Sequence, residues 1–373
     1  MKTISCIVGA RPNFMKIAPI VAEVARSETL RARLIHTGQH YSAEMSETFF
    51  RDLDLPLPDE CLETPTGTQT EQTAFMMRAL ERSFCGNRPD LVLVVGDVTS
   101  TVAGALVAAR LGIPVAHVEA GLRSFDRRMP EELNRVITDA ISEFLFVTEP
   151  SGVRNLKTEG VPEDRIFFVG NVMIDTLLRF RERAMQSEVL TRLSLAPKSY
   201  ILVTIHRPSN VDDPRQLHQI TELLNELSGR LPVVFPVHPR TRQRLAGSKL
   251  NRELILTPAL GYLDFVRLMA DARLVLTDSG GIQEETTILH VPCLTLRENT
   301  ERPITIDVGT NRLIGANPAA ALQFALEALD RNEVRCGVPE LWDGHASRRI
   351  TRILERKLVS LETLLGAQPS ASF

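Results

Sequence analysis

Two carboxylates, Asp97 and Glu119, stand where a parallel sheet would bring them to the same edge. Residues 91–95 and 114–118 are short, Val-rich apolar runs typical of strands buried on both faces, and each acid closely follows one of them. Residues 99–111 alternate small and apolar side chains, which predicts the crossover helix of a βαβ unit. Both acids would then leave the carboxyl ends of parallel strands, where open α/β sheets bind ligands. This placement predicts acid–base chemistry or ligand binding.

A third acid, Glu131, follows Pro130 in a sequence typical of a helix start, where proline suits the first position and acids favour the positive end of the dipole. The residues alone do not separate a chemical role for Glu131 from that structural one. The other two acids also have structural alternatives. Asp97 could cap the following helix, and Glu119 could pair with Arg123.

The first predicted strand, residues 3–8, leads into the loop GARPNFMK, which carries Arg11 and Lys16. A dinucleotide-binding turn would have the pattern GxGxxG at this place, and the loop lacks it. Two cations beside the N–H groups of a helix start instead favour an anion such as phosphate. The alternative is a pair of solvated surface cations.

A second group of candidates follows another predicted strand, where Ser279, Gly280 and Gly281 precede a helix. Paired glycines let the backbone close on a ligand, and the N–H groups of the helix start suit a phosphate. Glu285, one turn into that helix, is well placed to accept hydrogen bonds from ribose hydroxyls. The alternative is a plain helix cap by Asp278 or Ser279.

Arg302 and His206 complete this second group. Arg302, in the sequence TERP, offers a bidentate guanidinium fork for phosphate. His206 follows the predicted strand at residues 200–205, and a histidine at such a strand end is a candidate acid, base or phosphate donor. Its alternative is a structural histidine bonded to a loop carbonyl.

Strands and helices alternate along the chain, which predicts an α/β fold with two Rossmann-like doubly wound domains and an active-site cleft between them. We expect a first domain at residues 1–171 with the catalytic acids, a second at residues 172–343 with the phosphate-binding turn, and at residues 344–373 a helix that packs back on the first domain and ends in a frayed tail. The predicted strands are 3–8, 33–37, 91–95, 114–118, 144–147, 166–169, 200–205, 232–236, 253–256, 274–277, 292–296 and 312–315.

The composition bounds the class of protein. The 373 residues are 43% hydrophobic and 24% charged with a net charge of -3, which argues against a nucleic-acid binder because such a footprint would be basic. No apolar run approaches the roughly 20 residues that a membrane helix needs. The start of the chain also lacks the apolar core and cleavage site of a signal peptide. We therefore expect a cytoplasmic protein with neither a nucleic-acid nor a membrane partner.

Metal and redox cofactors are not expected. The five cysteines are scattered and form no CxxC pair, which predicts reduced thiols and no zinc site. His36 and His40 are four residues apart, but Gly38 between them breaks the helix that such a metal pair requires. Since a dinucleotide fingerprint is also missing, we predict chemistry without a cofactor.

Motifs along nearly the whole chain resemble those of the non-hydrolysing UDP-N-acetylglucosamine 2-epimerases. They are GARPNFMK, GDVTSTVAG, HVEAGLRSFDRRMPEELNR, VGNVMID, TIHRP, PVHP, DSGGIQEE and RENTERP. The resemblance implies a GT-B-like fold, a homodimer and a place in surface polysaccharide precursor synthesis. It also implies reversible conversion of UDP-N-acetylglucosamine to UDP-N-acetylmannosamine, by anti elimination of UDP to 2-acetamidoglucal and re-addition, with the second domain binding the UDP moiety.

The resemblance also implies roles for individual residues. The positions matching Asp97, Glu119, Glu131 and His206 serve the chemistry, and all but Glu131 are also expected to contact substrate. Contacts to the nucleotide or its phosphates are implied for Arg11, Lys16, Phe265, Ser279, Gly280, Gly281, Glu285 and Arg302. Without the resemblance, Phe265 in GYLDFVRLM would be assigned to the core.

The chain departs from the family's motifs at two places, and several alternative functions remain open. IHRPSNVDD stands where well-known bacterial members carry GHRRE and a Gly-rich stretch, which puts regulation by a second substrate molecule in doubt. Leu260 replaces a glutamine, which removes a possible contact to uracil. The alternatives are a UDP-2,3-diacetamido-2,3-dideoxyglucuronate 2-epimerase, a GT-B glycosyltransferase, a hydrolysing relative that releases N-acetylmannosamine, and a non-catalytic nucleotide-sugar sensor.

Overall fold

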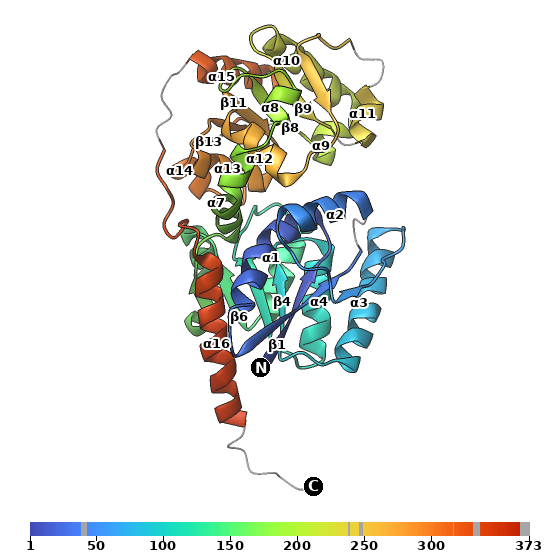
Figure 1. The fold of residues 1–373 in the computed structure, drawn as a ribbon, viewed down its shortest axis with the longest axis vertical. Coiled ribbons are helices and arrows are strands. Elements are labelled where there is room, and N and C mark those ends of the chain that lie inside the picture. The colour runs from blue at the N-terminus through green and yellow to red at the C-terminus, as the bar shows by residue number, and fades with distance from the viewer. Residues whose placement is uncertain (39–42, 238, 246–248, 316, 331–335, 366–373) are drawn as a thin grey trace. The chain divides into compact units, whose positions relative to one another are not determined.

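The chain divides into two compact units (Figure 1). Unit 1 comprises Met1–Thr176 with Glu340–Phe373, and unit 2 comprises Leu177–Pro339. The computed structural model describes residues 1–38, 43–237, 239–245, 249–315, 317–330 and 336–365. The frayed tail expected at residues 366–373 and the histidine at position 40 lie outside the described residues.

Unit 1 is built on a seven-stranded parallel sheet in the order β3-β2-β1-β4-β5-β6-β7. The order reverses between β1 and β4, and doubly wound sheets bind ligands beside such a point. β3 was not predicted, because two residues are too few to show a pattern. The strands are β1 (Lys2–Val8), β2 (Leu30–His36), β3 (Glu60–Cys61), β4 (Leu91–Val95), β5 (Val115–Ala120), β6 (Phe144–Val147) and β7 (Ile166–Phe168).

Helices connect the strands of unit 1, and α4 packs closely on the sheet. A Cβ added at Gly104 would lie 3.2 Å from Ile7 and 3.3 Å from Val94, so the glycine permits this close approach. The helices are α1 (Arg11–Val24), α2 (Ala43–Asp52), α3 (Gln69–Gly86), α4 (Thr99–Arg110), α5 (Pro130–Ile141), α6 (Pro150–Thr158) and α16 (Ala346–Leu365), with a short 3₁₀ helix η1 (Glu163–Arg165). α7 (Val172–Met185) contains the boundary between the units.

Unit 2 has a six-stranded parallel sheet in the order β10-β9-β8-β11-β12-β13, which reverses between β8 and β11. The strands are β8 (Ile201–Thr204), β9 (Val233–Pro236), β10 (Leu254–Thr257), β11 (Leu274–Thr277), β12 (Cys293–Thr295) and β13 (Asn311–Leu313). The helices are α8 (Val189–Arg192), α9 (Pro208–Val211), α10 (Pro214–Ser228), α11 (Pro239–Leu245), α12 (Tyr262–Ala270), α13 (Gly280–Leu289), α14 (Ile304–Asp307) and α15 (Pro318–Asp330).

The two parallel sheets confirm the predicted class of two Rossmann-like α/β domains. The core strands were the easiest elements to predict, because parallel strands are buried on both faces and therefore appear as apolar runs in the sequence. All five side chains of β4 are fully buried, and this strand has its predicted bounds. The four-residue helices α8, α9 and α14 were missed, since one turn is too short for helical periodicity.

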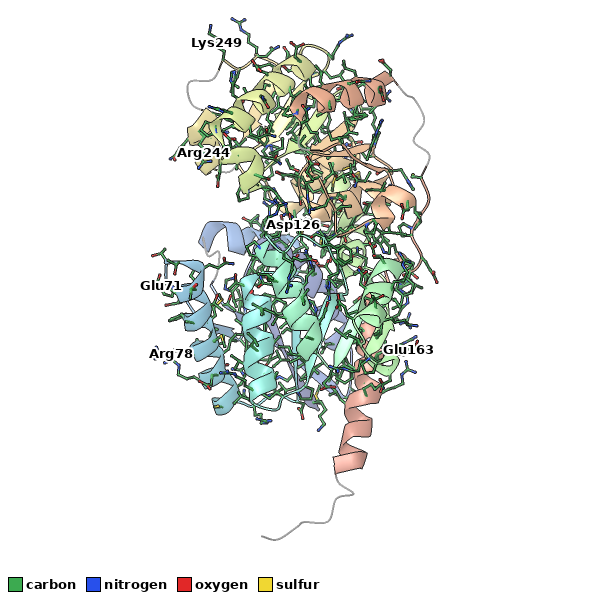
Figure 2. The ribbon with its side chains drawn as sticks, turned by 180° about the vertical axis from the view of Figure 1, so that it is seen from behind. Glu71, Arg78, Asp126, Glu163, Arg244 and Lys249 are labelled. Carbon is green, nitrogen blue, oxygen red and sulfur yellow. The ribbon has the colours of Figure 1, made fainter. Side chains whose placement is uncertain are left out.

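The surface of unit 1 carries the charged side chains that its composition predicts. Figure 2 shows Glu71 and Arg78 on α3 and Glu163 in η1 projecting away from the ribbon, and all three are exposed. Within the described part of the chain, no helix is both long enough and apolar enough to cross a membrane.

The last helix, α16, belongs to unit 1 (Figure 1). Just before it, the buried Trp342 donates from Nε1 to the carbonyl oxygen of Thr148 at 3.0 Å. The start of α16 is capped by another part of the chain, because the carboxylate of Asp175 accepts from the backbone N–H groups of Ala346 at 3.0 Å and Ser347 at 2.7 Å. Asp175 thus anchors the C-terminal helix to α7.

We expect Asp175→Ala to destabilise unit 1, because helix-capping side chains contribute about 1–2 kcal/mol. Thermal unfolding should show a melting temperature lowered by a few degrees. Asp164→Ala, at an exposed position in η1, is the matched control and should leave the melting temperature unchanged. Equal melting temperatures for Asp175→Ala and the wild type would show that the cap contributes nothing.

Candidate active site

Glu119 forms a buried ion pair with Lys16, across the point where β1, β4 and β5 end. Nζ of Lys16 donates to Oε2 of Glu119, and the two side chains are 6% and 2% exposed. Glu119 has a φ of 72°, in the left-handed region that non-glycine residues rarely adopt, and the pairing of β5 with β6 shifts register there. Such strained backbone positions cluster at functional sites. The alternative partner for Glu119, Arg123, instead pairs with Asp139 and Glu159.

The end of β4 packs directly against this ion pair. Gly96 has a φ of 68°, which strains any other residue, and a Cβ added there would lie 2.7 Å from Nζ of Lys16 and displace it. The adjoining turn after β1 is held by Asn13, whose Oδ1 accepts from the backbone N–H groups of Gly9 and Ala10 at 3.1 and 3.0 Å. Nδ2 of the same residue donates to a carbonyl oxygen of β4 at 3.0 Å.

Arg11 and Lys16 are not a pair of solvated surface cations, which was the alternative to an anion site. Lys16 is buried, as described above, and Arg11 is half-buried at the first position of α1. The guanidinium of Arg11 lies 4.5 Å from the ring centre of Phe49, a cation–π contact that holds the side chain. Unit 1 therefore places two ordered cations at the loop predicted to bind an anion.

Asp97 forms an ion pair with Arg135, on α5. The N-cap residue of α4 is Val98, which makes no side-chain capping bond. The backbone carbonyl of Asp97 also accepts from Nδ2 of Asn134 at 2.8 Å, so two neighbouring residues of α5 hold this turn. The Asp97 side chain keeps 23% of its surface exposed, which leaves it reachable by a ligand.

Glu131 and its neighbour Glu132 differ in their surroundings. Glu131 is half-exposed in the first turn of α5, consistent with either of its two interpretations. Glu132 is buried, and it accepts from the backbone N–H groups of Ser124 and Phe125, both at 2.9 Å, and from Arg135. Burial alone would raise the pKa of Glu132, but these hydrogen bonds and the charge of Arg135 outweigh it and lower the pKa. Glu132 therefore orders the loop before α5 as a carboxylate.

In unit 2, His206 and Asp278 follow β8 and β11, the strands between which the sheet order reverses. Nδ1 of His206 lies 3.0 Å from Oδ1 of Asp278, and the imidazole is 60% exposed while Asp278 is fully buried. The carboxylate also accepts from the backbone N–H groups of His206 and Arg207 and from Nδ2 of Asn210, at 2.9 to 3.1 Å. His206 is thus oriented by a carboxylate and not by the loop carbonyl of the structural alternative.

We expect Asp278 to make unit 2 sensitive to acid. Burial alone would raise the pKa of Asp278, but the hydrogen bond and charge of His206, with the bonds from Asn210 and Arg207, outweigh it and lower the pKa. A lowered pKa in the folded state stabilises the protein above the ordinary aspartate pKa of about 4, and this contribution is lost as the pH falls through the lowered value. Urea unfolding of Asp278→Asn should therefore show a shallower loss of stability below pH 4 than the wild type. Parallel curves would contradict this assignment.

The turn Ser279-Gly280-Gly281 leads into α13, as predicted, and Ser279 makes no side-chain capping bond. A buried ion-paired cluster lies against the turn. Arg302 is 6% exposed, and it donates from Nε to Glu284 at 2.7 Å and from Nη1 to Glu301. Two nitrogens of the Arg302 guanidinium, which was predicted to bind phosphate, are therefore hydrogen-bonded to carboxylates. The same side chain packs against Gly280.

Glu285 and Phe265 come from neighbouring helices, α13 and α12. Oε1 of Glu285 accepts from the hydroxyl of Tyr262 at 3.0 Å, and both side chains are buried. Burial and the neighbouring Glu285 charge raise the pKa of Tyr262, so it stays a donor. Phe265 is half-buried, one turn after Tyr262.

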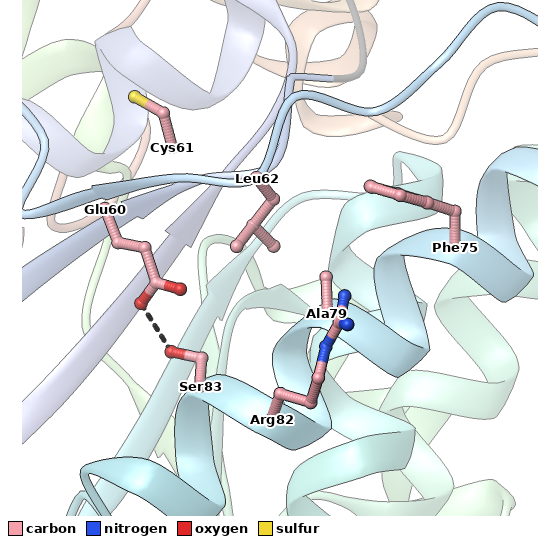
Figure 3. Close-up of a pocket in the computed structure, with 7 residues that line it drawn as sticks. All are labelled: Glu60, Cys61, Leu62, Phe75, Ala79, Arg82 and Ser83. Atoms are coloured by element: carbon pink, nitrogen blue, oxygen red, sulfur yellow. Dashed lines mark hydrogen bonds between the residues drawn. The ribbon is translucent and has the colours of Figure 1, made fainter.

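A hollow of about 350 Å³ lies between β3 and α3 in unit 1 (Figure 3). Its polar wall is the pair Glu60 and Ser83, whose hydroxyl donates to Glu60 at 2.6 Å, and Phe75 lines the opposite side. None of the predicted site residues lines the hollow. The described residues also contain no group of His, Cys, Asp and Glu side chains that would hold a metal ion.

Comparison with known proteins gives one consistent result. The family model of UDP-N-acetylglucosamine 2-epimerase matches residues 22–355. The UDP-N-acetylglucosamine 2-epimerase of Methanocaldococcus jannaschii is 42% identical over 94% of this chain and 98% of its own. The UDP-2,3-diacetamido-2,3-dideoxy-D-glucuronate 2-epimerase of Pseudomonas aeruginosa is 41% identical over 94% of this chain and 98% of its own.

A solved structure extends the similarity to three dimensions. The crystal structure of the Methanocaldococcus jannaschii UDP-GlcNAc 2-epimerase in complex with UDP-GlcNAc and UDP matches with a TM-score of 0.86 at 41% identity, over 95% of this chain and 99% of that chain. With a family model and relatives that span nearly its whole length, the chain belongs to the UDP-N-acetylglucosamine 2-epimerase family.

Proposed function

We propose that the protein interconverts UDP-N-acetylglucosamine and UDP-N-acetylmannosamine by inverting C2 of the sugar. The observation that carries the proposal is the pair of carboxylates at the ends of β4 and β5, each with its own cationic partner: Asp97 with Arg135 and Glu119 with Lys16. The 42% identity to a UDP-N-acetylglucosamine 2-epimerase, with 98% of that protein covered, supports this substrate.

The proposed reaction proceeds through the leaving group. A carboxylate removes the C2 proton while the bond from C1 to the diphosphate oxygen breaks, so that UDP leaves with the electron pair and a double bond forms between C1 and C2. The product is 2-acetamidoglucal. Re-addition of UDP at C1 with protonation of C2 from the opposite face gives the epimer. Protons are transferred on two faces, so at least two acid–base groups are needed.

Unit 1 is proposed to supply those groups, from Asp97, Glu119 and Glu131. The cationic partners of Asp97 and Glu119 hold these two carboxylates in place at the sheet edge. Lys16 and Arg11 lie at the same sheet edge, where they add positive charge for a departing diphosphate.

Unit 2 is proposed to hold the nucleotide. The first N–H groups of α13, after Ser279 and Gly280, form an anion site at the positive end of the helix dipole. Glu285 is a ribose acceptor whose orientation Tyr262 fixes. The exposed imidazole of His206, oriented by Asp278, is a proton donor for a phosphate oxygen.

Incubation with UDP-N-acetylglucosamine in D2O tests the proposal, with the C2 proton followed by NMR. Epimerisation predicts deuterium at C2 in both recovered UDP-sugars. Free N-acetylmannosamine would instead identify a hydrolase, and transfer of the sugar to an acceptor with release of UDP and the C2 proton intact would identify a glycosyltransferase. Absence of exchange with this substrate and with its diacetamido uronate analogue would contradict an epimerase of either kind.

A second candidate substrate is UDP-2,3-diacetamido-2,3-dideoxyglucuronate, because the Pseudomonas aeruginosa enzyme is 41% identical to this chain. Comparing kcat/KM for the two sugars in the same exchange assay decides between them. We further propose that the enzyme acts as a cytoplasmic homodimer in the supply of surface polysaccharide precursors. Light scattering checks the dimer.

A further inference from the structure

A buried histidine lies between the turn that carries Asp97 and the end of β5, which carries Glu119. His117 lies on β5 and is fully buried. Its Nδ1 lies 2.6 Å from Oδ1 of Asp139, on α5, and its Nε2 lies 2.8 Å from the carbonyl oxygen of Gly96. The sequence gives little sign of this network, because its members lie on a strand, a turn and a helix that are separated along the chain.

Both partners of the imidazole are acceptors. A carbonyl oxygen and an ionised carboxylate cannot donate, so both ring nitrogens of His117 carry a proton when both bonds are made. Burial would raise the pKa of Asp139, but the charge and hydrogen bond of His117, with those of Arg123, outweigh it and lower the pKa. The geometry therefore describes an imidazolium paired with a carboxylate.

The charges alternate outward from this pair. Nη1 of Arg123 lies 2.7 Å from Oδ2 of Asp139, and its Nε and Nη2 donate to the two carboxylate oxygens of Glu159 at 2.8 and 2.7 Å. Two cations and two carboxylates thus form a chain with no net charge, whose outer member is 38% exposed. Alternation makes a buried imidazolium tolerable, since each charge has an opposite neighbour.

Asp139 is linked by hydrogen bonds to the backbone beside each of the two acids. Through His117 it holds the carbonyl of Gly96, which is the peptide group that precedes Asp97. Directly, its Oδ2 accepts from the backbone N–H of Gly121 at 3.0 Å, just beyond Glu119. We propose that His117 and Asp139 are positioning residues that set the distance and orientation of the two acids. This inference rests on the proposed function of Asp97 and Glu119.

A purely structural role makes a different prediction. If the network only stabilises unit 1, its loss lowers the melting temperature and leaves turnover unchanged wherever the protein is folded. If it positions the acids, turnover falls while nucleotide affinity persists, because most of the nucleotide groups proposed above belong to unit 2 and the network contacts neither Arg11 nor Lys16 in the hydrogen bonds described. A displacement of about 1 Å at reacting groups costs on the order of 100-fold in rate.

The test is steady-state C2 exchange by the full-length His117→Gln and Asp139→Asn variants, well below their melting temperatures. We expect kcat to fall by about 10- to 100-fold, with the Kd for UDP and the KM within about two- to three-fold of wild type. Asp175→Ala is the control, since it removes a buried carboxylate of the same unit that caps α16, and it should keep its kcat. A kcat within two-fold of wild type for folded His117→Gln would overturn the proposal.

Two further measurements test the proposal, and the second needs no variant to fold. In His117→Gly, added imidazole should restore exchange, whereas 1-methylimidazole should not, because it can donate only one hydrogen bond. In wild-type protein with ¹⁵N-labelled histidine, NMR should show protons on both ring nitrogens of His117, and a single N–H would contradict the imidazolium. The NMR result does not depend on substrate, so a wild type that shows no exchange would contradict the proposed function alone.

Discussion

Asp97→Asn, Glu119→Gln and Glu131→Gln should each lower kcat by about 100-fold or more, the usual scale for loss of a positioned acid or base. Each change replaces a carboxylate with an amide of the same size, so packing is preserved while proton transfer is lost. In Glu119→Gln, Lys16 also loses the charge of its partner. C2 exchange in D2O measures the loss directly.

Binding of UDP should survive in all three variants, and isothermal titration checks this. Glu28→Gln, at an exposed position between α1 and β2, is the matched control and should behave as wild type. Near-normal turnover in any one variant would remove that residue from the proton transfers. For Glu131, such a result would establish the helix-start interpretation, which its half-exposed position leaves open.

Gly280→Ala should weaken UDP binding by about 10- to 100-fold, the range for losing charge-assisted hydrogen bonds to phosphate. The new Cβ would lie 2.4 Å from Nη1 of Arg302 and 2.7 Å from Oε1 of Glu301. These side chains are 6% and 3% exposed and paired with each other, so they cannot move aside without breaking a buried ion pair. The start of α13 must shift instead, and with it the N–H groups proposed to bind the diphosphate.

Gly86→Ala is the control for this substitution, because a Cβ there meets nothing within 4 Å. It should leave both UDP affinity and stability unchanged. Fluorescence competition or calorimetry gives the two Kd values. Wild-type affinity in Gly280→Ala, with the fold intact by circular dichroism, would place the phosphate site elsewhere.

The sheets were predictable because several core strands are almost continuous apolar runs between turn residues, as in 91–95 and 274–277. The resemblance to the epimerases is also confirmed, and family membership makes the protein an isomerase. The structural alternative that failed, an ion pair of Glu119 with Arg123, joined residues close in the sequence. Asp97 and Glu119 both bond to residues far along the chain, and such partners follow from the fold and not from spacing.

The polar network of α5 was missed for a related reason. Glu132, Arg135 and Asp139 recur at helical spacing, yet all three are buried, while Leu133 and Ile137 on the same helix are 40% and 41% exposed. A charged stripe on a helix normally predicts its solvent face. The sequence did contain one sign of burial: cations and acids alternate along this stripe, so that neighbouring side chains can form ion pairs with one another.

The place of α16 has a consequence for synthesis on the ribosome. Unit 1 needs Trp342 and α16, yet these emerge only after all of Leu177–Pro339. Unit 2 is continuous in sequence, so it can complete its fold while the seven-stranded sheet still lacks its last helix. Nascent chains stalled when residue 339 has emerged from the ribosome, but α16 has not, should therefore hold a protease-resistant second unit and an incompletely folded first unit.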